Sequence, residues 1–429
     1  MSIGTPAVPA GGRKVSPIAW YREMAAGQRR TFWACYGGHA LDAMDTQLYS
    51  WVLPALLSQW SLSRAQAGEI GTAALLSSAI GGWAAGILAD RIGRVRTLQI
   101  TILWFAGFSF LSGLAENYAQ LFAARALLGF GFGGETAASA VLIGEIIDAR
   151  HRGKGVGLVQ SGWSLGSMLA AGVATLFFSV LPEAQAWRAV FFVGLLPAVL
   201  VFVIRRLVTE PQVFTESRKR ADSGGREASF LAIFSRPILK TTILAALIST
   251  GSLGGNYTLS IWLPAFLKTV RGLSVLNTGG FLAVMICGAF TGYVVGSYLT
   301  DRIGRRKHFV VFALGSLVTV YAYTLIPISN TVMLFLGFPL GFFSSGIFAA
   351  IGAYFTELFP TPIRASGQGF AFNFGRGVGA LFPMLVGYLG ATMPLGTAIG
   401  VFALFAYVLV LAALLFLPET RGRVLTAEA

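Results

Sequence analysis

Two stretches of the sequence decide the fold: Gly86-Ile87-Leu88-Ala89-Asp90-Arg91-Ile92-Gly93-Arg94 and Ser297-Tyr298-Leu299-Thr300-Asp301-Arg302-Ile303-Gly304-Arg305. Both end in Asp-Arg-Ile-Gly-Arg, and both follow a long apolar run. Three further pairs of matches repeat at nearly the same offset of about 210 residues: Trp51-Val52-Leu53-Pro54-Ala55 with Trp262-Leu263-Pro264-Ala265, Glu145 with Glu357, and Thr209-Glu210-Pro211 with Pro418-Glu419-Thr420. We infer that the chain consists of two halves related by duplication.

The composition places both halves in a membrane. Of the 429 residues, 55% are hydrophobic and only 12% are charged, whereas about 25% of the residues of an average soluble protein are charged. So few charges cannot cover a water-soluble globule, which excludes a soluble enzyme, a disordered chain and an ordinary nucleic-acid-binding protein. A membrane-spanning helix needs about 20 apolar residues, and the sequence predicts twelve: 31–57, 67–89, 97–115, 119–147, 155–181, 188–208, 238–267, 277–300, 308–327, 331–356, 365–391 and 394–417. The fold class is therefore predicted to be an all-α integral membrane protein.

The longest break between apolar runs, 209–237, divides the twelve predicted helices into six and six. The predicted domains are a tail at 1–30, a first bundle at 31–208, a linker at 209–237, a second bundle at 238–417 and a tail at 418–429. Parallel six-helix halves are typical of one large class of secondary transporters.

The basic residues predict the orientation. Of the 32 Lys and Arg residues, 26 fall in the two tails and the even-numbered loops, and four fall on the other side. Cytoplasmic loops carry this excess, so both termini are expected in the cytoplasm of a bacterial inner-membrane protein. The basic loops then face anionic lipid headgroups, and the net charge of +14 requires no nucleic acid.

The repeated loops predict a charged latch on the cytoplasmic side. Gly86 allows neighbouring helices to approach closely. Asp90 is expected to cap the next helix or to pair with a basic residue, and Arg91 and Arg94 are expected to engage Glu145. The predicted gating residues of both halves are Asp90, Arg91, Arg94, Glu145, Arg152, Asp301, Arg302, Arg305, Glu357 and Arg364. The alternative is that these charges only anchor the loops at the membrane surface.

Five ionisable residues lie deep inside predicted spans, where charges are costly and usually functional: Asp42, Asp45, Arg125, Glu135 and Arg376. Four of them fall within roughly 3–5 Å of the membrane midplane, at about 1.5 Å per residue, and Arg125 lies farther out. The equivalent positions in the other half are neutral, so duplication does not explain these charges. Two acids three residues apart should not both stay ionised, and we expect Asp42, Asp45 and Glu135 with Arg125 to handle protons. A permanent Asp45–Arg125 salt bridge is the alternative, and His39 is expected to be a polar lining residue or a contact between helices.

Arg376 is the predicted substrate-binding residue, because a guanidinium fork suits a carboxylate. Asn373 lies one turn away, and Asn256, Tyr257 and Gln160 are candidates on other helices. The sequence has no metal-ligand spacing for its two cysteines, no phosphate-binding Gly-x4-Gly-Lys-Ser/Thr loop and no nucleophile–base constellation. We therefore expect no enzyme activity, no cofactor and no metal.

The Asp-Arg-x-Gly-Arg loops and the repeated Glu-x7-Arg spacing resemble the signature of the major facilitator superfamily, over residues 25–420. Asp42-x-x-Asp45 with Arg125 and Glu145 resembles the aromatic acid/proton symporters, and Gly131-Phe132-Gly133-Gly134-Glu135 resembles their sialate and metabolite relatives. The resemblance implies a monomer that takes up a small organic anion with protons: an aromatic acid, its ring-cleavage product or another monocarboxylate. The first alternative is a proton-driven drug exporter. Such exporters resemble one another in a Gly-Pro motif of the fifth helix, and the corresponding stretch Val159–Gly166 has no such motif. The second is a non-transporting receptor.

Overall fold

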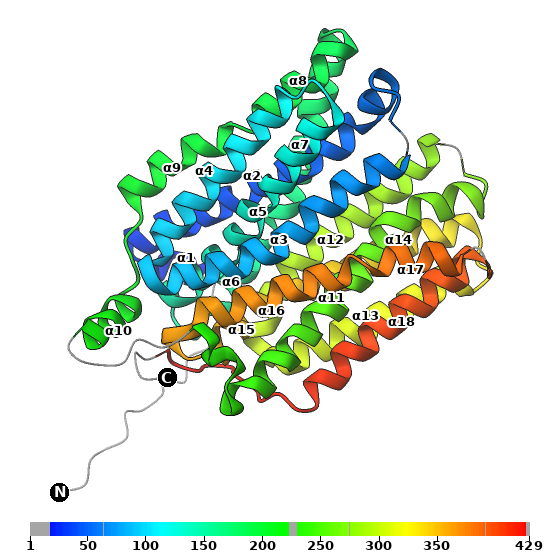
Figure 1. Ribbon diagram of the computed structural model, residues 1–429. Helices are drawn as coiled ribbons and strands as arrows, with labels where there is room; N and C mark the ends of the chain where they lie inside the picture. Colours follow the sequence, from blue (N-terminus) through cyan, green and yellow to red (C-terminus); the bar gives the residue numbers. More distant parts are fainter. Residues whose placement is uncertain (1–17, 63, 223–229, 274, 391, 426–429) are drawn as a thin grey trace, which may run out of the picture.

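The computed structural model describes residues 18–62, 64–222, 230–273, 275–390 and 392–425, and all regular structure in these ranges is helical (Figure 1). The first half contains α1 (Ala19–Glu23), α2 (Ala26–Gln59), α3 (Arg64–Ile92), α4 (Arg94–Gly113), α5 (Tyr118–Ile146), α6 (Arg152–Gln160), α7 (Gly162–Val180), α8 (Glu183–Val193) and α9 (Leu196–Leu207). Between the halves lie α10 (Gln212–Asp222) and the 3-10 turn η1 (Phe230–Phe234). The second half contains α11 (Arg236–Thr269), α12 (Val275–Ile303), α13 (Arg305–Leu325), α14 (Asn330–Gly346), α15 (Phe348–Leu358), the 3-10 turn η2 (Thr361–Ile363), α16 (Arg364–Gly379), α17 (Phe382–Leu389) and α18 (Leu395–Leu414).

Nine helical segments within the described ranges are long and apolar enough to cross a membrane. The other three predicted spans are helical as well, but they are either less apolar or divided into shorter helices. The polar side chains of His39, Asp42 and Asp45 lie on α2, and they lower its hydropathy. The spans predicted at 188–208 and 365–391 are each broken into two shorter helices, α8–α9 and α16–α17.

Each half has its own apolar core. One cluster of buried side chains is built from residues 245–417 only, and two further clusters are built almost entirely from residues 20–208. Within the first half α3 and α4 pack on α5, and within the second half α12 packs on α14 and α11 on α18. Side chains on the outer surface are apolar and exposed, as for Met168 (65%), Val318 (67%) and Phe335 (72%), which is the surface that lipid tails require.

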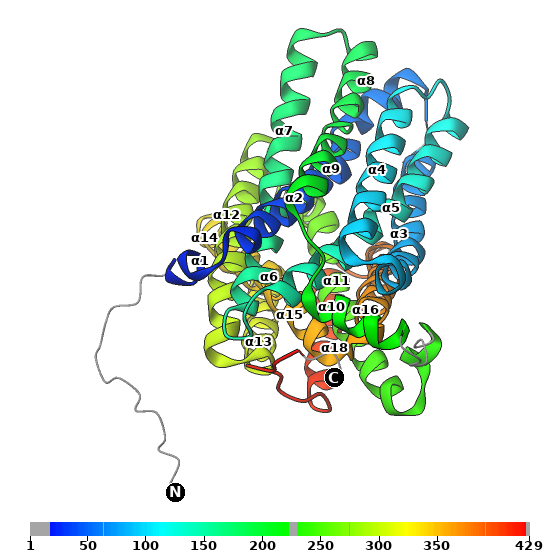
Figure 2. The ribbon, with the colours of Figure 1, turned by 90° about the vertical axis from the view of Figure 1, so that its left-hand side faces the viewer.

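The two halves meet at one end of the molecule and separate at the other. α1, α10 and the last described residues lie toward the same end of the molecule (Figures 1 and 2), and we call this the termini end. There α3 packs against α16, and α6 packs against α12 and α15. Toward the opposite end α17 packs against α11 and α18 of its own half. The contact between α7 of the first half and α12 of the second is small. The halves are therefore joined at the termini end and apart at the opposite end.

Small residues make the close approach at the termini end possible. A Cβ atom on Gly86 would overlap the carbonyl oxygen of Ala365 in the other half. A Cβ on Gly157 would lie 2.7 Å from the Ser297 side chain and 2.8 Å from the Ala349 carbonyl oxygen. Both positions therefore require glycine while the halves are in contact.

Candidate functional site

The first latch joins the halves around Glu145, whose carboxylate is fully buried. Arg94, at the start of α4, donates to both Glu145 oxygens at 3.1 Å. Arg364, from the second half, donates to Oε1 of Glu145 at 2.7 Å. Arg364 takes the place that was expected for Arg91, whose side chain is exposed. One buried carboxylate is thus held by one arginine from each half.

Asp90 completes the first latch by capping a helix of the other half. It accepts hydrogen bonds from the backbone N–H groups of Ala365 (3.2 Å) and Ser366 (2.7 Å) and from the Ser366 hydroxyl (2.7 Å), at the start of α16. It also pairs with Arg94 at 3.3 Å. The sequence left open whether Asp90 caps the next helix or pairs with a basic residue, and the structure shows the pair together with a cap on α16.

The helix that follows Asp90 in the chain, α4, is capped by Glu210 and not by Asp90. Its carboxylate accepts from the backbone N–H groups of Arg94 and Val95, each at 2.9 Å. Burial raises the pKa of Glu210, because the loss of solvation outweighs these hydrogen bonds. Glu419 caps α13 in the same way, through the N–H groups of Arg305 (2.9 Å) and Arg306 (3.0 Å). The repeated Glu210 and Glu419 of the sequence are therefore a matched pair of helix caps.

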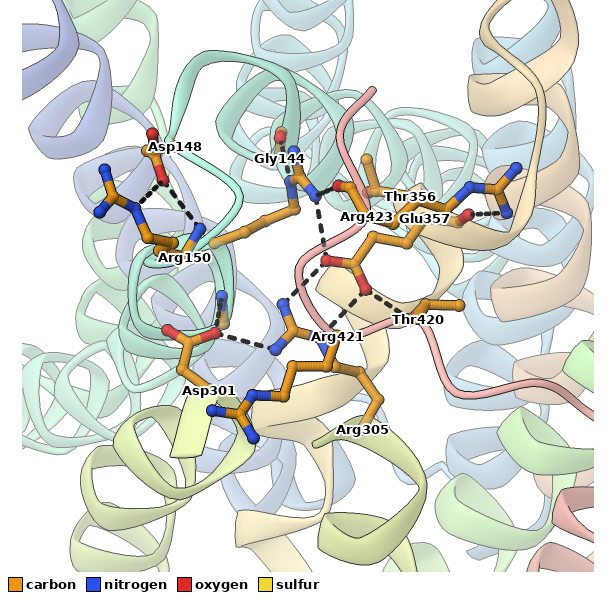
Figure 3. Close-up of polar contacts among 12 residues, drawn as sticks. Gly144, Asp148, Arg150, Asp301, Arg305, Thr356, Glu357, Thr420, Arg421 and Arg423 are labelled. Atoms are coloured by element: carbon orange, nitrogen blue, oxygen red, sulfur yellow. Dashed lines mark hydrogen bonds and ion pairs between the residues drawn. The ribbon is translucent and has the colours of Figure 1, made fainter. Parts of the chain in front are cut away.

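The second latch repeats the first around Glu357 (Figure 3). Arg305 donates to Glu357 at 3.0 and 2.8 Å, and Arg152 from the first half donates at 3.0 Å. Asp301 accepts from the backbone N–H groups of Gly153 and Lys154, both at 2.8 Å. The side chain of Arg302, like that of Arg91, is exposed.

The C-terminal segment adds bonds to the second latch that the sequence analysis missed (Figure 3). The Thr420 hydroxyl donates to Glu357 at 2.5 Å, and Arg423 donates to the Glu357 carbonyl oxygen at 2.9 Å. Arg152 in turn donates to the Arg423 carbonyl oxygen at 2.8 Å. The segment thus bonds to both halves. The sequence marks this segment only by the match of Pro418-Glu419-Thr420 with Thr209-Glu210-Pro211. That match ends at Thr420 and therefore does not predict the contacts of Arg423.

Asp45 and Arg125 form a buried ion pair within the first half, which we call the lateral pair. Nη1 of Arg125 lies 3.7 Å from Oδ2 of Asp45. The Ser109 hydroxyl donates to Oδ1 of Asp45, and the guanidinium lies over the Tyr49 ring at 5.3 Å. Neither Ser109 nor Tyr49 was predicted, because neither carries a charge that marks it within an apolar helix.

A second group of charges lies where the halves meet, and we call it the central cluster: His39, Asp42, Glu135 and Arg376. Nδ1 of His39 lies 3.6 Å from Oε2 of Glu135. One side-chain atom each of His39, Asp42 and Glu135 lies within 4.8 Å of the others, and Arg376 interacts electrostatically with both acids. All four side chains are at least nine-tenths buried. His39, expected to line the path or to contact a neighbouring helix, therefore faces Glu135 of α5.

Arg376 reaches across from α16 into the first half. Its fork donates to the hydroxyls of Ser78 (3.5 Å) and Thr136 (3.4 Å). The guanidinium lies over the rings of Phe132 (4.3 Å) and Phe372 (5.1 Å). In the described part of the chain no carboxylate lies within ion-pair distance of Arg376. Its nearest polar partners are therefore neutral.

A cavity of about 290 Å³ lies between the halves. Residues of α2, α7, α11, α12 and α14 line it: Gln47, Trp163, Ser164, Ser167, Asn256, Leu259, Ser260, Pro264, Leu282, Met285, Ile286, Ala289, Tyr293, Ser344 and Ser345. Trp163 in its wall also contacts the rings of His39 (6.0 Å) and Phe132 (6.4 Å). Since Phe132 stacks on Arg376, the central cluster lies one side chain behind the cavity wall.

The other predicted substrate-binding residues are placed differently. Asn256 lines the cavity, and Tyr257 interacts with Arg376. Asn373 is buried and donates to the carbonyl oxygens of residues 133 and 369, at 3.4 and 3.0 Å, as a contact between helices. Gln160 lines a separate small cavity with Thr136 and Phe372. The substrate-binding roles of these residues remain predictions.

In the described ranges, His39, Asp42 and Glu135 are the one group with enough nearby donors to hold a metal ion. Two carboxylates and an imidazole are suitable ligands for a divalent cation. The guanidinium of Arg376 places a positive charge beside the same carboxylates, which opposes binding of a second cation. The donor set therefore suits a proton better than a metal.

Comparison with known proteins identifies the family. The family model described as Major Facilitator Superfamily matches residues 35–331 and 282–428. A relative from Cupriavidus pinatubonensis, described as a "probable 4-methylmuconolactone transporter", is 43% identical over 407 residues, which cover 94% of each chain. The sialic acid transporter NanX of Escherichia coli is 28% identical over 382 residues, which cover 89% of this chain and 92% of that protein.

Among solved structures, the proton:xylose symporter XylE bound to 6-bromo-6-deoxy-D-glucose matches with a TM-score of 0.78 at 20% identity, covering 94% of this chain and 98% of that chain. The protein is a membrane transporter, and the chain belongs to the major facilitator superfamily. The resemblance predicted from the Asp-Arg-Ile-Gly-Arg loops is confirmed, and so are the all-helical fold of this family and the expectation that the protein is not an enzyme.

Proposed function

We propose that this protein imports a small organic monocarboxylate together with protons across a bacterial inner membrane. One observation carries the proposal: Arg376 lies buried between the halves, and its partners there are hydroxyl groups and aromatic rings. In this proposal the substrate carboxylate binds the guanidinium fork of Arg376, while its ring occupies the adjacent cavity.

The comparison of Arg376 with the other buried arginines supports this role. Arg94, Arg305 and Arg364 each donate to a glutamate at 3.1 Å or less, and Arg125 pairs with Asp45. Arg376 donates two long hydrogen bonds to hydroxyl groups and interacts with the Tyr257 hydroxyl, and its Nε has no hydrogen-bond partner among the described residues. A guanidinium with an unused donor in this position can form a charge-assisted hydrogen bond to an incoming carboxylate.

The relatives and the cavity support the substrate class. 4-Methylmuconolactone and sialic acid, named in the descriptions of two relatives, both combine one carboxylate with a ring that bears neutral polar groups. The cavity is lined by the rings of Trp163 and Tyr293 and by the amides of Gln47 and Asn256. Its volume of about 290 Å³ lies at the small end of the range for ligand sites.

Proton coupling follows from the membrane potential. One anion that enters a negative cell alone costs about 2.3 kcal/mol per 100 mV, and one accompanying proton cancels its charge. The candidate proton carriers are Asp42 and Glu135 of the central cluster and, as the alternative, Asp45 of the lateral pair, whose partner is Arg125. With the termini end in the cytoplasm, as the basic residues indicate, the closed latches correspond to an outward-facing state.

The test is uptake into proteoliposomes with a panel of 4-methylmuconolactone, sialic acid, benzoate and the neutral methyl ester of benzoate. We expect uptake of at least one carboxylate, dependence on an inward proton gradient, loss with an uncoupler, and no uptake of the ester. Uptake that is unchanged by the uncoupler would refute proton coupling. Proton-driven efflux of uncharged or cationic compounds, without carboxylate uptake, would establish the exporter instead.

A further inference from the structure

The buried charges divide into two groups that differ in balance. The lateral pair holds one acid, Asp45, and one base, Arg125, 3.7 Å apart. Asp45 also accepts a hydrogen bond from Ser109, which stabilises its ionised form. The lateral pair is therefore neutral without any added proton.

The central cluster is not balanced. Two carboxylates, Asp42 and Glu135, face one guanidinium, Arg376, beside the imidazole of His39. Both oxygens of Glu135 and Oδ2 of Asp42 are buried without a hydrogen-bond partner among the described residues. Unpaired buried carboxylate oxygens are costly, and a proton on one carboxylate both removes a charge and supplies a donor.

The groups around the central cluster do not supply the missing positive charge. From α2, Cys35 and Asp45 face the two acids, and from α11, Tyr257 faces Arg376. A thiol and a phenol are neutral at physiological pH, and Asp45 is already paired. Neutrality of the empty cluster therefore requires one bound proton.

A bound substrate carboxylate increases by one the number of protons that the central cluster needs to be neutral. With the substrate bound at Arg376, three carboxylates face one guanidinium, so a second proton is needed to keep the cluster neutral. We propose that the central cluster, and not the lateral pair, takes up the transported proton, one for each substrate carboxylate, on Asp42, Glu135 or the adjacent His39. This inference rests on the proposed function, since it requires a carboxylate at Arg376.

The geometry also provides a route for the proton. Trp163 forms part of the cavity wall and contacts the His39 ring at 6.0 Å between ring centres. His39 lies 3.6 Å from Glu135. Trp163 therefore stands between the cavity and His39, and a proton that passes Trp163 can reach Glu135 through His39, which can accept on one ring nitrogen and donate from the other.

The experiment measures proton uptake on substrate binding to the purified transporter. Calorimetric titration with the best carboxylate of the uptake panel, in two buffers of different ionisation enthalpy, gives the number of protons bound per substrate. We expect about one proton for the wild type, with affinity falling about tenfold per pH unit above the pKa of the site. The double variant Asp42→Asn/Glu135→Gln should bind substrate with no proton uptake and no pH dependence.

The matched control neutralises the lateral pair with Asp45→Asn/Arg125→Gln, which leaves no unpaired charge. We expect it to keep uptake of one proton per substrate. Loss of proton uptake in this control would overturn the inference and assign the proton to Asp45, while the proposed function would stand. Binding that requires sodium at fixed pH would also overturn it. Failure of the wild type to bind any carboxylate would instead refute the proposed function. If the Asp42/Glu135 variant does not fold, the Asp45/Arg125 variant still decides.

Discussion

Asp90→Ala should open the termini end of the transporter. Asp90 accepts three hydrogen bonds from the other half, at 2.7, 2.7 and 3.2 Å, and all three are lost when α3 and α16 separate. A hydrogen bond to a charged group contributes about 1.5–3 kcal/mol net of water. Because bonds to one carboxylate are not additive, we expect a loss of about 2–4 kcal/mol from the closed state, or roughly 30- to 1000-fold in the equilibrium.

The first half should stay folded in this variant. Arg94 loses its pair with Asp90 at 3.3 Å but keeps both bonds to Glu145. Ser366→Ala removes only the hydroxyl bond and should shift the equilibrium by about tenfold. Asp148→Ala is the matched control, because Asp148 is exposed and bonds only to Arg150 of the same half among the described residues; it should cause no shift.

The assay is the distance distribution between two spin labels, one on an exposed position of each half at the termini end. The exposed Cys287 must be replaced first, while Cys35 is buried. We expect a short-distance population in the wild type and a long-distance population in Asp90→Ala. A closed fraction equal to that of the wild type in Asp90→Ala would refute the role of the latch.

Three further predictions concern the centre of the protein. Arg376→Lys keeps the charge but loses the planar fork, so binding of every transported carboxylate should weaken at least about tenfold with normal membrane insertion; unaltered affinity would remove Arg376 from the site. Asp45→Asn alone leaves Arg125 buried without a counter-charge, which costs about 3–5 kcal/mol and should lower the melting temperature in detergent; a melting temperature unchanged from the wild type would show that the pair is not structural. Gly133→Leu should abolish folded expression, because even a Cβ there overlaps a backbone carbonyl of α3, whereas Gly107→Ala, with open space around it, should express as the wild type; the idea fails if both express equally.

The membrane-spanning helices were predictable because twenty apolar residues in a row have few other structures available in a membrane. The breaks within four of them, between α6 and α7, α8 and α9, α14 and α15, and α16 and α17, were not predicted, although in two the sequence carried a signal. α9 and α17 both begin with a proline at the second position, Pro197 and Pro383, and proline favours the first turn of a new helix. Pro211 likewise precedes α10, a helix within the segment that was predicted as a linker.

The contents of the site were predictable from depth along each helix, but the partners were not. Spacing along α2 and α5 brings the three acids Asp42, Asp45 and Glu135 of the first half to similar heights, and it does not fix how the helices are rotated about their axes. His39 pairs with Glu135, and Arg364 rather than Arg91 pairs with Glu145, because these contacts depend on that rotation. The Ser109 bond to Asp45 depends on it as well.

The two halves differ in a way that bears on how motion and binding are linked. The latches are repeated in both halves, but the positions equivalent to Arg376 and Glu135 are Ser164 and Ser345, which both line the cavity. If each half carried its own acid and base, the pairs would form within a half and would not sense relative movement. Because Arg376 comes from the second half and Asp42 and Glu135 come from the first, rocking of the halves changes the distance between them. The asymmetry of the central charges therefore ties the charge balance of the site to the state of the symmetric latches.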